Sequence, residues 1–403
     1  MTASHAHRIR DVLRWLHRWI GLGTAMFLVL AGLSGCLLAF NTELERVFAP
    51  QLFARSHPAP GTPRLDLAEL ATRAQALMPD ARVLSVTYSE PDQASVYFEP
   101  RPDPSTGRPR VLGFTDFFLD PWTGAELGRR DHGNLREGLI NVMPFLYEFH
   151  WRLVAGNVGQ WLMGTAALFW TCDCFIAIAL TLPRPPWRGR FWSRWGEAWR
   201  MKQGVSPGRR LFDLHRAGGL WLWCLLLVFA WSSVMMNHRP VFEWVMSRIS
   251  DYQPDAVLPP HPVSAPRLDW AAALRVAEPL MAEQARGHGF TQAGPQSLMY
   301  DPSANVYMYS VYGSRDLFER SPKGGGTTVT FDADTGALIS LWQATGERFG
   351  NTVESWLYAL HMARVFGRPY QCLVSLLGLG LAILSITGVL IWWRKRRIRP
   401  RNG

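Results

Sequence analysis

Four histidines stand beside the most apolar segments of the chain, and their surroundings occur twice. His17 and His215 each follow a leucine and precede an arginine, and a glycine comes four residues later in both cases. His150 and His361 each end a Phe/Trp-Leu-Tyr-x-x-His pattern. Neutral imidazole is a common metal ligand, so four in a duplicated frame suggest two paired ligand sites. Between apolar helices, a pair of imidazoles is typical of the axial ligands of haem iron.

The elements that must position these histidines are four apolar runs. Their lengths suit a bilayer, which takes about 20 residues to cross. The runs are 19–40, 158–182, 218–236 and 372–393, and the third helix is expected to begin earlier, near Leu211. Many of the 19 Trp residues lie at the edges of the runs, as in the aromatic belts of membrane proteins.

The formal net charge of +10 is concentrated beside the apolar runs. Arginines dominate the N-terminal segment, the connection 184–210 and the tail 394–403. The positive-inside rule places these segments and both termini in the cytoplasm. The two long loops are then periplasmic, in a bacterial inner membrane. Because the charges adjoin the spans, we interpret them as topology signals and expect no nucleic-acid partner.

The chain divides into two similar halves, 8–183 and 208–395. Each contains an apolar run, a long loop, a histidine-bearing segment and a second run, which predicts two similar sites related by pseudo-symmetry. The expected parts are a first span, a loop module, a second span, a basic connection, a third span, a second loop module, a fourth span and a basic tail. In that order they cover 1–40, 41–140, 141–183, 184–210, 211–237, 238–350, 351–393 and 394–403.

Both long loops have the pattern of a small α+β module, with a helical stretch before strand-like alternation. The stretches are 67–77, 83–98 and 111–119 in the first loop, and 270–285, 307–312 and 327–331 in the second. Each loop also contains Asp-x-x-Thr-Gly, beginning at Asp120 and Asp332. This motif predicts a tight turn, because Asp accepts backbone hydrogen bonds and Gly adopts positive φ.

The histidine frame, the two Asp-x-x-Thr-Gly turns and the closing segment Ser385-Ile-Thr-Gly-Val-Leu-Ile-Trp-Trp393-Arg resemble the PepSY-associated transmembrane family over nearly the whole chain. The expected fold is an α-helical membrane protein with four transmembrane helices in two pseudo-repeats, plus two small α+β PepSY-like extracytoplasmic modules. Family members characterised as inner-membrane ferric-siderophore reductases carry two b-type haems between four spans, so the resemblance implies two haem b groups here. The second span departs from the pattern, because it lacks the Thr-Gly-x-x-x-Trp-Trp ending of the fourth.

The expected depths of the histidines define two pairs. His17 and His215 lie at the cytoplasmic ends of the first and third spans, whereas His150 and His361 precede the second and fourth spans on the other side. Haem iron with two imidazole ligands is six-coordinate, which favours electron transfer over oxygen binding.

Other residues are secondary candidates. Arg152 and Arg364 follow ligand histidines on the face where the positive-inside rule requires no cation, so they are expected to pair with haem propionates. Asp173 is an acid inside a span and hence a functional candidate, the alternative being a buried protonated side chain. His238 lies at the outer end of the third span, near the expected outer haem or substrate. Glycines in the first and fourth spans fit close approach of a helix or of a cofactor, namely Gly21, Gly23, Gly32, Gly35, Gly378, Gly380 and Gly388.

Two functions remain open. The first is a haem-dependent membrane reductase that passes electrons outward to a ferric siderophore or another ferric chelate for iron acquisition. Its electron donor is then a separate cytoplasmic protein or a quinol, because no flavin- or nicotinamide-binding module is attached. The alternative is a PepSY-type membrane binding or regulatory protein without a cofactor. A transporter is less favoured, because the spans hold one acid and no clear pair of broken helices.

Overall fold

The computed structural model describes residues 3–55, 59, 61–184, 189–254, 258–263, 265–317 and 326–398. Residues 185–188 of the expected basic connection and 399–403 of the expected tail lie outside these ranges. The chain forms two compact units, each built from segments of both halves. The first unit comprises Met1–Phe40, Leu146–Val245 and Leu360–Gly403, and the second Asn41–Phe145 and Met246–Ala359.

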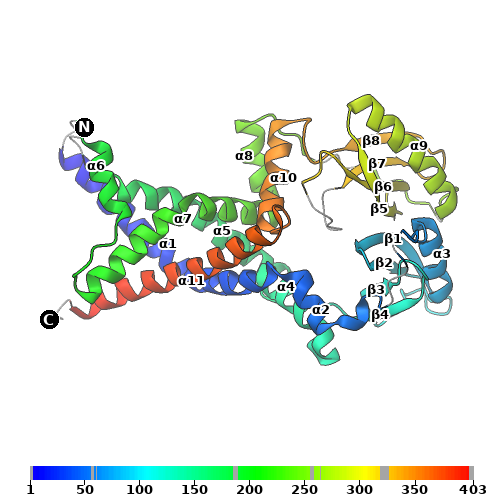
Figure 1. Cartoon of the computed structure of the whole chain (residues 1–403), viewed down its shortest axis with the longest axis horizontal. Helices are drawn as coiled ribbons and strands as arrows, with labels where there is room; N and C mark the ends of the chain where they lie inside the picture. Colours follow the sequence, from blue (N-terminus) through cyan, green and yellow to red (C-terminus); the bar gives the residue numbers. More distant parts are fainter. Residues whose placement is uncertain are drawn as a thin grey trace. The chain divides into compact units, whose positions relative to one another are not determined.

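Four long helices of the described chain form the first unit, and Figure 1 shows them running alongside one another. They are α1 (Ala3–Leu38), α5 (Gly156–Thr181), α7 (Pro207–Asn237) and α11 (Gly367–Ile398). Packing runs around a ring, from α1 to α5, from α5 to α7, from α7 to α11 and back to α1. In this order α1 and α7 are diagonal, as are α5 and α11. Diagonal helices of a four-helix bundle face one another across its core.

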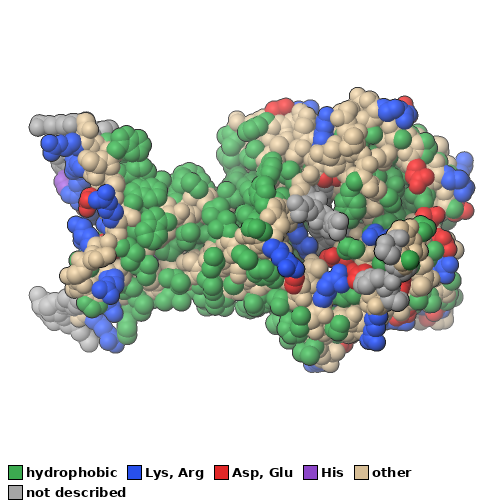
Figure 2. All heavy atoms as spheres, viewed as in Figure 1, with side chains coloured by type: hydrophobic (Ala, Val, Ile, Leu, Met, Phe, Trp, Pro, Cys, Tyr) green, Lys and Arg blue, Asp and Glu red, His purple; other side chains and the backbone are tan. Residues whose placement is uncertain are grey.

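Each of these four helices is long and apolar enough to cross a membrane, and most residues of each apolar segment face outward. Figure 2 shows hydrophobic side chains over the visible face of the bundle. Exposed apolar side chains on the spans include Met26, Phe169, Leu376 and Ile383. A soluble bundle has polar residues on this face, so its solvent is lipid. The protein is therefore a multi-pass membrane protein.

The four predicted spans are confirmed, although every helix begins before its apolar run and the first two end one or two residues short of theirs. The third begins at Pro207, where Ser206 accepts a hydrogen bond from the backbone N–H of Arg209 and caps the helix. Arginines on the exposed surface mark the beginning of α1 and the end of α11, among them Arg8, Arg14, Arg394 and Arg396. Arg10 of α1 donates to the carbonyl oxygen of Leu182, just after α5 (3.1 Å). The beginning of α1 and the end of α5 therefore lie on one side.

Short helices precede the second and fourth spans, and each carries one of the predicted histidines. His150 lies near the end of α4 (Val142–Arg152), and His361 ends α10 (Phe349–His361). Left-handed residues then reverse the chain into the spans, at Leu153 and Val154 in the first half and at Ala363 and Phe366 in the second. Other short helices are α2 (Asn41–Phe48), η1 (Pro50–Leu52), η2 (Leu135–Glu137), η3 (Leu139–Asn141), α6 (Phe191–Gly196), η4 (Glu197–Trp199) and α8 (Arg239–Ile249).

The second unit is built on one antiparallel sheet of eight strands in the described chain, ordered β4-β3-β2-β1-β5-β6-β7-β8. The first loop supplies α3 (Leu67–Leu77), β1 (Ala81–Glu90), β2 (Gln93–Pro100), β3 (Asp116–Leu119) and β4 (Glu126–Arg130). The second supplies α9 (Trp270–His288), β5 (Gln292–Asp301), β6 (Val306–Gly313), β7 (Thr327–Asp332) and β8 (Leu338–Trp342).

The two α+β modules share this sheet, because β1 pairs with β5 through Ser85–Met299, Val86–Leu298 and Thr87–Ser297. One hydrophobic core joins the inward side chains of the strands to both α3 and α9. Buried and partly exposed residues alternate along β1, so one face of the sheet is covered by the helices. The sequence patterns predicted two modules but not their union.

The module predictions hold for the helices and less well for the strands. The helix 67–77 is confirmed in full, and the helix over 270–285 extends to His288. The alternation over 83–98 is a hairpin of two strands, and only residues 116–119 of the predicted strand 111–119 belong to a strand.

Both predicted turns are present, with Gly124 at φ 66° and Gly336 at φ 74°. The backbone N–H and hydroxyl of Thr335 donate to Asp332 and lower the pKa of its carboxyl.

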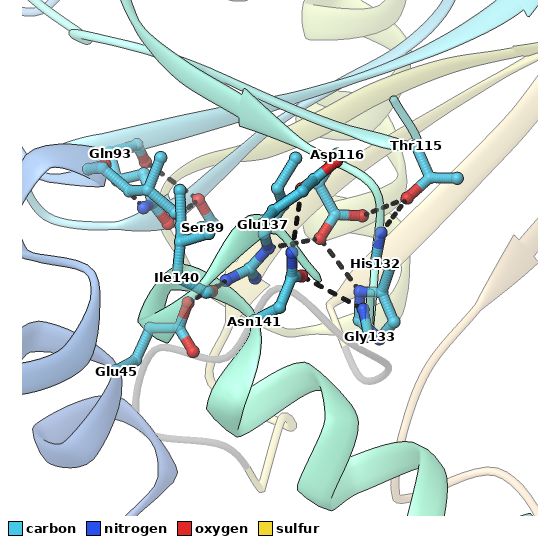
Figure 3. Close-up of polar contacts among 12 residues, drawn as sticks. Glu45, Ser89, Gln93, Thr115, Asp116, His132, Gly133, Glu137, Ile140 and Asn141 are labelled. Atoms are coloured by element: carbon cyan, nitrogen blue, oxygen red, sulfur yellow. Dashed lines mark hydrogen bonds and ion pairs between the residues drawn. The ribbon is translucent and has the colours of Figure 1, made fainter. Parts of the chain in front are cut away.

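An ion network ties α2 to the sheet around Arg130, whose side chain is 8% exposed. Its guanidinium donates to Asp116 (2.9 Å), to the carbonyl oxygen of Ile140 (2.7 Å) and to Glu45. His132 contacts the same carboxylate through Nδ1 (2.9 Å), and Figure 3 shows these groups converging. Burial raises the pKa of Asp116, but His132 and Arg130 outweigh burial and hold this pKa below its ordinary value.

Candidate functional site

The structure brings His17 and His215 together across the core of the bundle. His17 lies on α1 and His215 on α7, the diagonal helices, and their ring centroids are 6.1 Å apart. We call these two residues the first pair. His17 lies in the first half of α1 and His215 in the first third of α7, one half-chain apart in sequence.

His150 and His361 form a second pair, with ring centroids 6.3 Å apart. They reach the bundle from α4 and α10, the short helices that precede the second and fourth spans. Each pair therefore combines one histidine from each half of the chain.

The depth of the second pair follows from two serines. His150 contacts Ser34 of α1, and His361 contacts Ser232 of α7. Each serine follows the first-pair histidine of its own helix by 17 residues. At 1.5 Å per residue this corresponds to about 25 Å along the helix axis. Since the hydrocarbon core is about 30 Å thick, the pairs lie near opposite faces of a membrane.

The second pair has matching hydrogen bonds in the two halves. His150 Nδ1 lies 2.9 Å from Ser34 Oγ, and His361 Nδ1 lies 2.7 Å from Ser232 Oγ. Both hydroxyls donate to carbonyl oxygens of their own helices, those of Leu30 and Phe229. With its proton on that carbonyl, each serine oxygen is free to accept, which matches imidazoles that donate from Nδ1.

The first pair has its protons on the same nitrogens but bonds to different groups. His17 Nδ1 lies 2.8 Å and 3.0 Å from the two carboxylate oxygens of Asp173 on α5. His215 Nδ1 lies 3.1 Å from the carbonyl oxygen of Leu384 and 3.0 Å from Thr387 Oγ1, both on α11. Carbonyl and carboxylate oxygens are acceptors, so both imidazoles donate from Nδ1.

An imidazole that donates from Nδ1 keeps its lone pair on Nε2, which is the state that binds a metal, and all four rings have an acceptor at Nδ1. Metal-binding histidines typically donate their other N–H to a carboxylate, carbonyl or similar acceptor, which fixes the ring. A metal–imidazole bond is about 2 Å long. Two imidazoles on opposite sides of one metal ion then have centroids about 6 Å apart, close to the separation in each pair.

The donor set fits haem better than a bare metal ion. No group of three or more His, Cys, Asp or Glu side chains within the described ranges is placed to hold a metal ion. Two imidazoles alone are too few for a stable zinc site, which takes four ligands. Haem needs only the two axial ligands from the protein, since its porphyrin supplies the others.

Two glycines leave room beside the first pair. Gly21 and Gly219 follow His17 and His215 by four residues, so each lies one helical turn further on the same helix face. A Cβ added at either position meets nothing within 4 Å. This space fits the approach of a flat ring to both helix backbones.

The other predicted glycines divide between two roles. Gly32 of α1 and Gly378 of α11 form a helix crossing, because a Cβ at Gly32 would lie 2.6 Å from the carbonyl oxygen of Gly378. Gly35 and Gly388 adjoin rings of the histidine pairs, where an added Cβ would lie 3.0 Å from His150 Cε1 and 3.2 Å from His215 Cε1. Gly380 faces Leu222 of α7, and Gly23 is exposed.

The two predicted propionate partners already have interactions. Arg152 donates from Nε to Glu148, one turn earlier on α4, and its guanidinium lies 4.6 Å from the ring centroid of Trp151. Arg364 is partly exposed, in the turn between α10 and α11, and is also engaged with a neighbour. Pairing with propionates stays a prediction for both.

His238 caps the C-terminal end of α7 and attaches this helix to α5. Its Nε2 lies 3.1 Å from Thr165 Oγ1, and its ring lies so close to Gly164 that an added Cβ there would be 3.0 Å away. Its contacts are those of a packing residue, and a role toward haem or substrate stays a prediction.

The sequence patterns did not single out Ser34, Ser232 or Thr387. A serine in an apolar helix commonly bonds to a carbonyl one turn earlier, as Ser34 does, so each alone carries little information. For the two serines the signal was an identical spacing, since Ser34 follows His17 and Ser232 follows His215 by 17 residues.

The fold and the paired histidines define a membrane protein whose bundle presents two bis-imidazole sites. A comparison with protein families matches residues 14–395 to the PepSY-associated TM region. The chain therefore belongs to this family over nearly its whole length. No curated protein matches the chain significantly.

Proposed function

We propose that this protein is a di-haem b membrane oxidoreductase that carries electrons across a bacterial inner membrane to reduce a ferric chelate. The observation that carries the proposal is the arrangement of the four imidazoles: two pairs with ring centroids 6.1 Å and 6.3 Å apart, in which each ring has an acceptor oxygen at Nδ1.

When bound, haem iron supplies a one-electron couple at each pair. His17 and His215 would hold one group, and His150 and His361 would hold the other. Gly21 and Gly219 keep the helix backbones accessible, and the apolar bundle excludes water. Arg152 and Arg364 are the guanidinium groups available to meet propionates at the second pair.

The arginines at the beginning of α1 and the end of α11 support a cytoplasmic location for the first pair, by the positive-inside rule. The second pair then lies toward the periplasm, and the loop segments that form the sheet are periplasmic. This orientation supports electron flow outward.

The overall reaction balances with one electron per ferric ion. A quinol releases two electrons and two protons and therefore reduces two ferric ions, and a cytoplasmic redox protein is the other class of donor. Ferrous iron binds hard oxygen ligands more weakly than ferric iron, so reduction releases the metal from a siderophore.

Absorbance spectra of the purified full-length protein test the cofactor. The wild-type protein, produced with ample haem supply, should show a reducible b-type spectrum with two haems per chain. His17→Ala and His361→Ala should each remove one haem, whereas His238→Ala, at a histidine outside the pairs, should keep both. A colourless wild-type protein would overturn the proposal and favour the cofactor-free binding function.

Stopped-flow mixing tests the acceptor. Protein reduced with dithionite, freed of excess reductant and mixed with a panel of ferric siderophores should be reoxidised in proportion to the ferric iron added. Gallium complexes of the same siderophores are the control, since gallium(III) cannot accept an electron under these conditions. Failure across the panel would contradict reduction of ferric chelates.

A further inference from the structure

The two halves treat their first-pair histidines differently. His17 donates to a carboxylate, that of Asp173, whereas His215 donates to the neutral oxygens of Leu384 and Thr387. Asp173 and Leu384 occupy equivalent places, since each follows the second-pair histidine of its half by 23 residues. The second pair shows no such difference, since Ser34 and Ser232 serve both halves alike.

This carboxylate is well placed to act on the ring. Both of its oxygens lie within 3.0 Å of His17 Nδ1, and the Asp173 side chain is only 13% exposed. Ionisable side chains are costly inside a span and are usually retained for a function. A salt bridge that only joins helices has no need of a histidine whose ring lies 6.1 Å from a second imidazole.

A carboxylate acceptor makes the donating imidazole a stronger metal ligand. A stronger ligand stabilises the more highly charged oxidation state, and the negative charge acts in the same direction through space. The ferric state is therefore favoured at the first pair relative to the second, where serine hydroxyls are the acceptors.

We propose that Asp173 is a positioning residue that lowers the reduction potential of the first site below that of the second. This inference rests on the proposed function and deepens it. It gives electron transfer between the two sites a direction, because an electron that enters at the first pair moves to the site of higher reduction potential at the second. The contact between Asp173 and His17 supplies that direction without any difference in the histidines themselves.

Redox titration followed by absorbance, on the full-length protein in detergent, tests the proposal. Asp173→Asn keeps the shape and an acceptor oxygen but removes the charge. It should raise the lower midpoint potential by at least 59 mV, which is a tenfold change in relative ferric stabilisation for a one-electron couple, and leave the higher one unchanged. Thr387→Val, which removes a neutral acceptor from His215, is the matched control and should cause a smaller shift.

A second measurement does not depend on how Asp173→Asn folds. His17→Ala should abolish the lower midpoint potential and His150→Ala the higher. Loss of the higher potential in His17→Ala, or unmoved potentials in an Asp173→Asn protein that keeps two haems, would overturn the proposal while leaving the di-haem function intact. Absence of haem from the wild-type protein would instead overturn the proposed function itself.

Discussion

At the scale of single residues, the hydroxyls that hold the second pair combine two tasks. Ser232 is fully buried, and its oxygen accepts from His361 while its proton goes to the carbonyl oxygen of Phe229. Its neighbour Ser233 also donates to the Phe229 carbonyl oxygen, at 2.8 Å, but serves no histidine. Comparing the two adjacent serines therefore isolates the effect of supporting the His361 ring, because both bond to the helix backbone and Ser232 also contacts the ring.

We predict that Ser232→Ala lowers the free energy of unfolding by about 1–3 kcal/mol, because it leaves the buried Nδ1–H of His361 without its acceptor. Ser233→Ala should cost less than about 1 kcal/mol. Chemical unfolding in detergent micelles measures both. Equal effects of the two substitutions would contradict the support assigned to Ser232.

Asp116 predicts a pH dependence in the stability of the second unit, which contains the sheet. Its pKa in the folded protein lies below the ordinary value, so the fold favours its ionised form. The stabilisation is present above the unfolded pKa of about 3.9 and is lost as the pH falls through the lower folded pKa. Asp116→Asn should thus be less stable than the wild type near pH 7, and the difference should shrink below about pH 4. Unfolding followed by circular dichroism across this range measures it, and a difference independent of pH would contradict the ion network.

At the scale of elements, the crossing of α1 and α11 depends on backbone contact. Gly32 and Gly378 oppose one another so closely that a Cβ on either would lie 2.6 Å or 2.5 Å from the carbonyl oxygen of the other. Neither helix backbone can yield locally, so a methyl group there separates the helices. Gly23, in the same helix, faces open space.

Gly32→Ala should therefore destabilise the bundle despite the higher helix propensity of alanine. Gly23→Ala should be neutral or stabilising by up to about 1 kcal/mol. Thermal unfolding of the two variants in detergent checks this contrast. A Gly32→Ala protein as stable as the Gly23→Ala protein would show that the crossing tolerates a wider separation.

Sequence patterns predicted helices more completely than strands, for physical reasons visible in β5. Its Gly294 and Pro295 argue against a strand, yet irregular pairing with β6 accommodates both, and Gly294 adopts φ 142°. β4 and β8 were also missed; β8 is a partly exposed edge strand. By contrast α3 has a capping Asp66 and a regular apolar stripe, so its limits were predicted in full.

At the scale of the whole molecule, the shared sheet makes the two loop segments one folding unit. The partners of β1 at its centre belong to different halves, with Val86 paired to Val96 on β2 and to Leu298 on β5. Pairing between strands so distant in sequence has no local signal, which is why the sequence predicted the modules and not their junction. The histidine pairs were more predictable, because duplicated motifs specify equivalent depths.

A proline in β1, where the two modules are joined through the β1–β5 pairing, should weaken the strands of both halves. We predict that Val86→Pro accelerates amide hydrogen exchange in both β2 and β6, because it removes a donor from a central strand. Ile339→Pro is the control, since Ile339 lies at an irregularity of the edge strand β8 and should affect only its neighbours. Mass spectrometry of peptides after hydrogen–deuterium exchange measures the exchange rate in each strand. Faster exchange confined to β1 and β2 in Val86→Pro would mean that the modules unfold separately.

The composition of the pairs also bears on how such a protein arises. A chain with one half contains both kinds of histidine but completes neither pair, whereas two copies related by a two-fold axis complete both. An ancestor of this kind is a homodimer, and symmetry forces its two subunits to carry the same side chains. Gene duplication and fusion lift that constraint. The carboxylate of Asp173 opposite the Leu384 carbonyl is a difference that no homodimer can encode, so joining the halves in one chain is what makes an asymmetric bundle heritable.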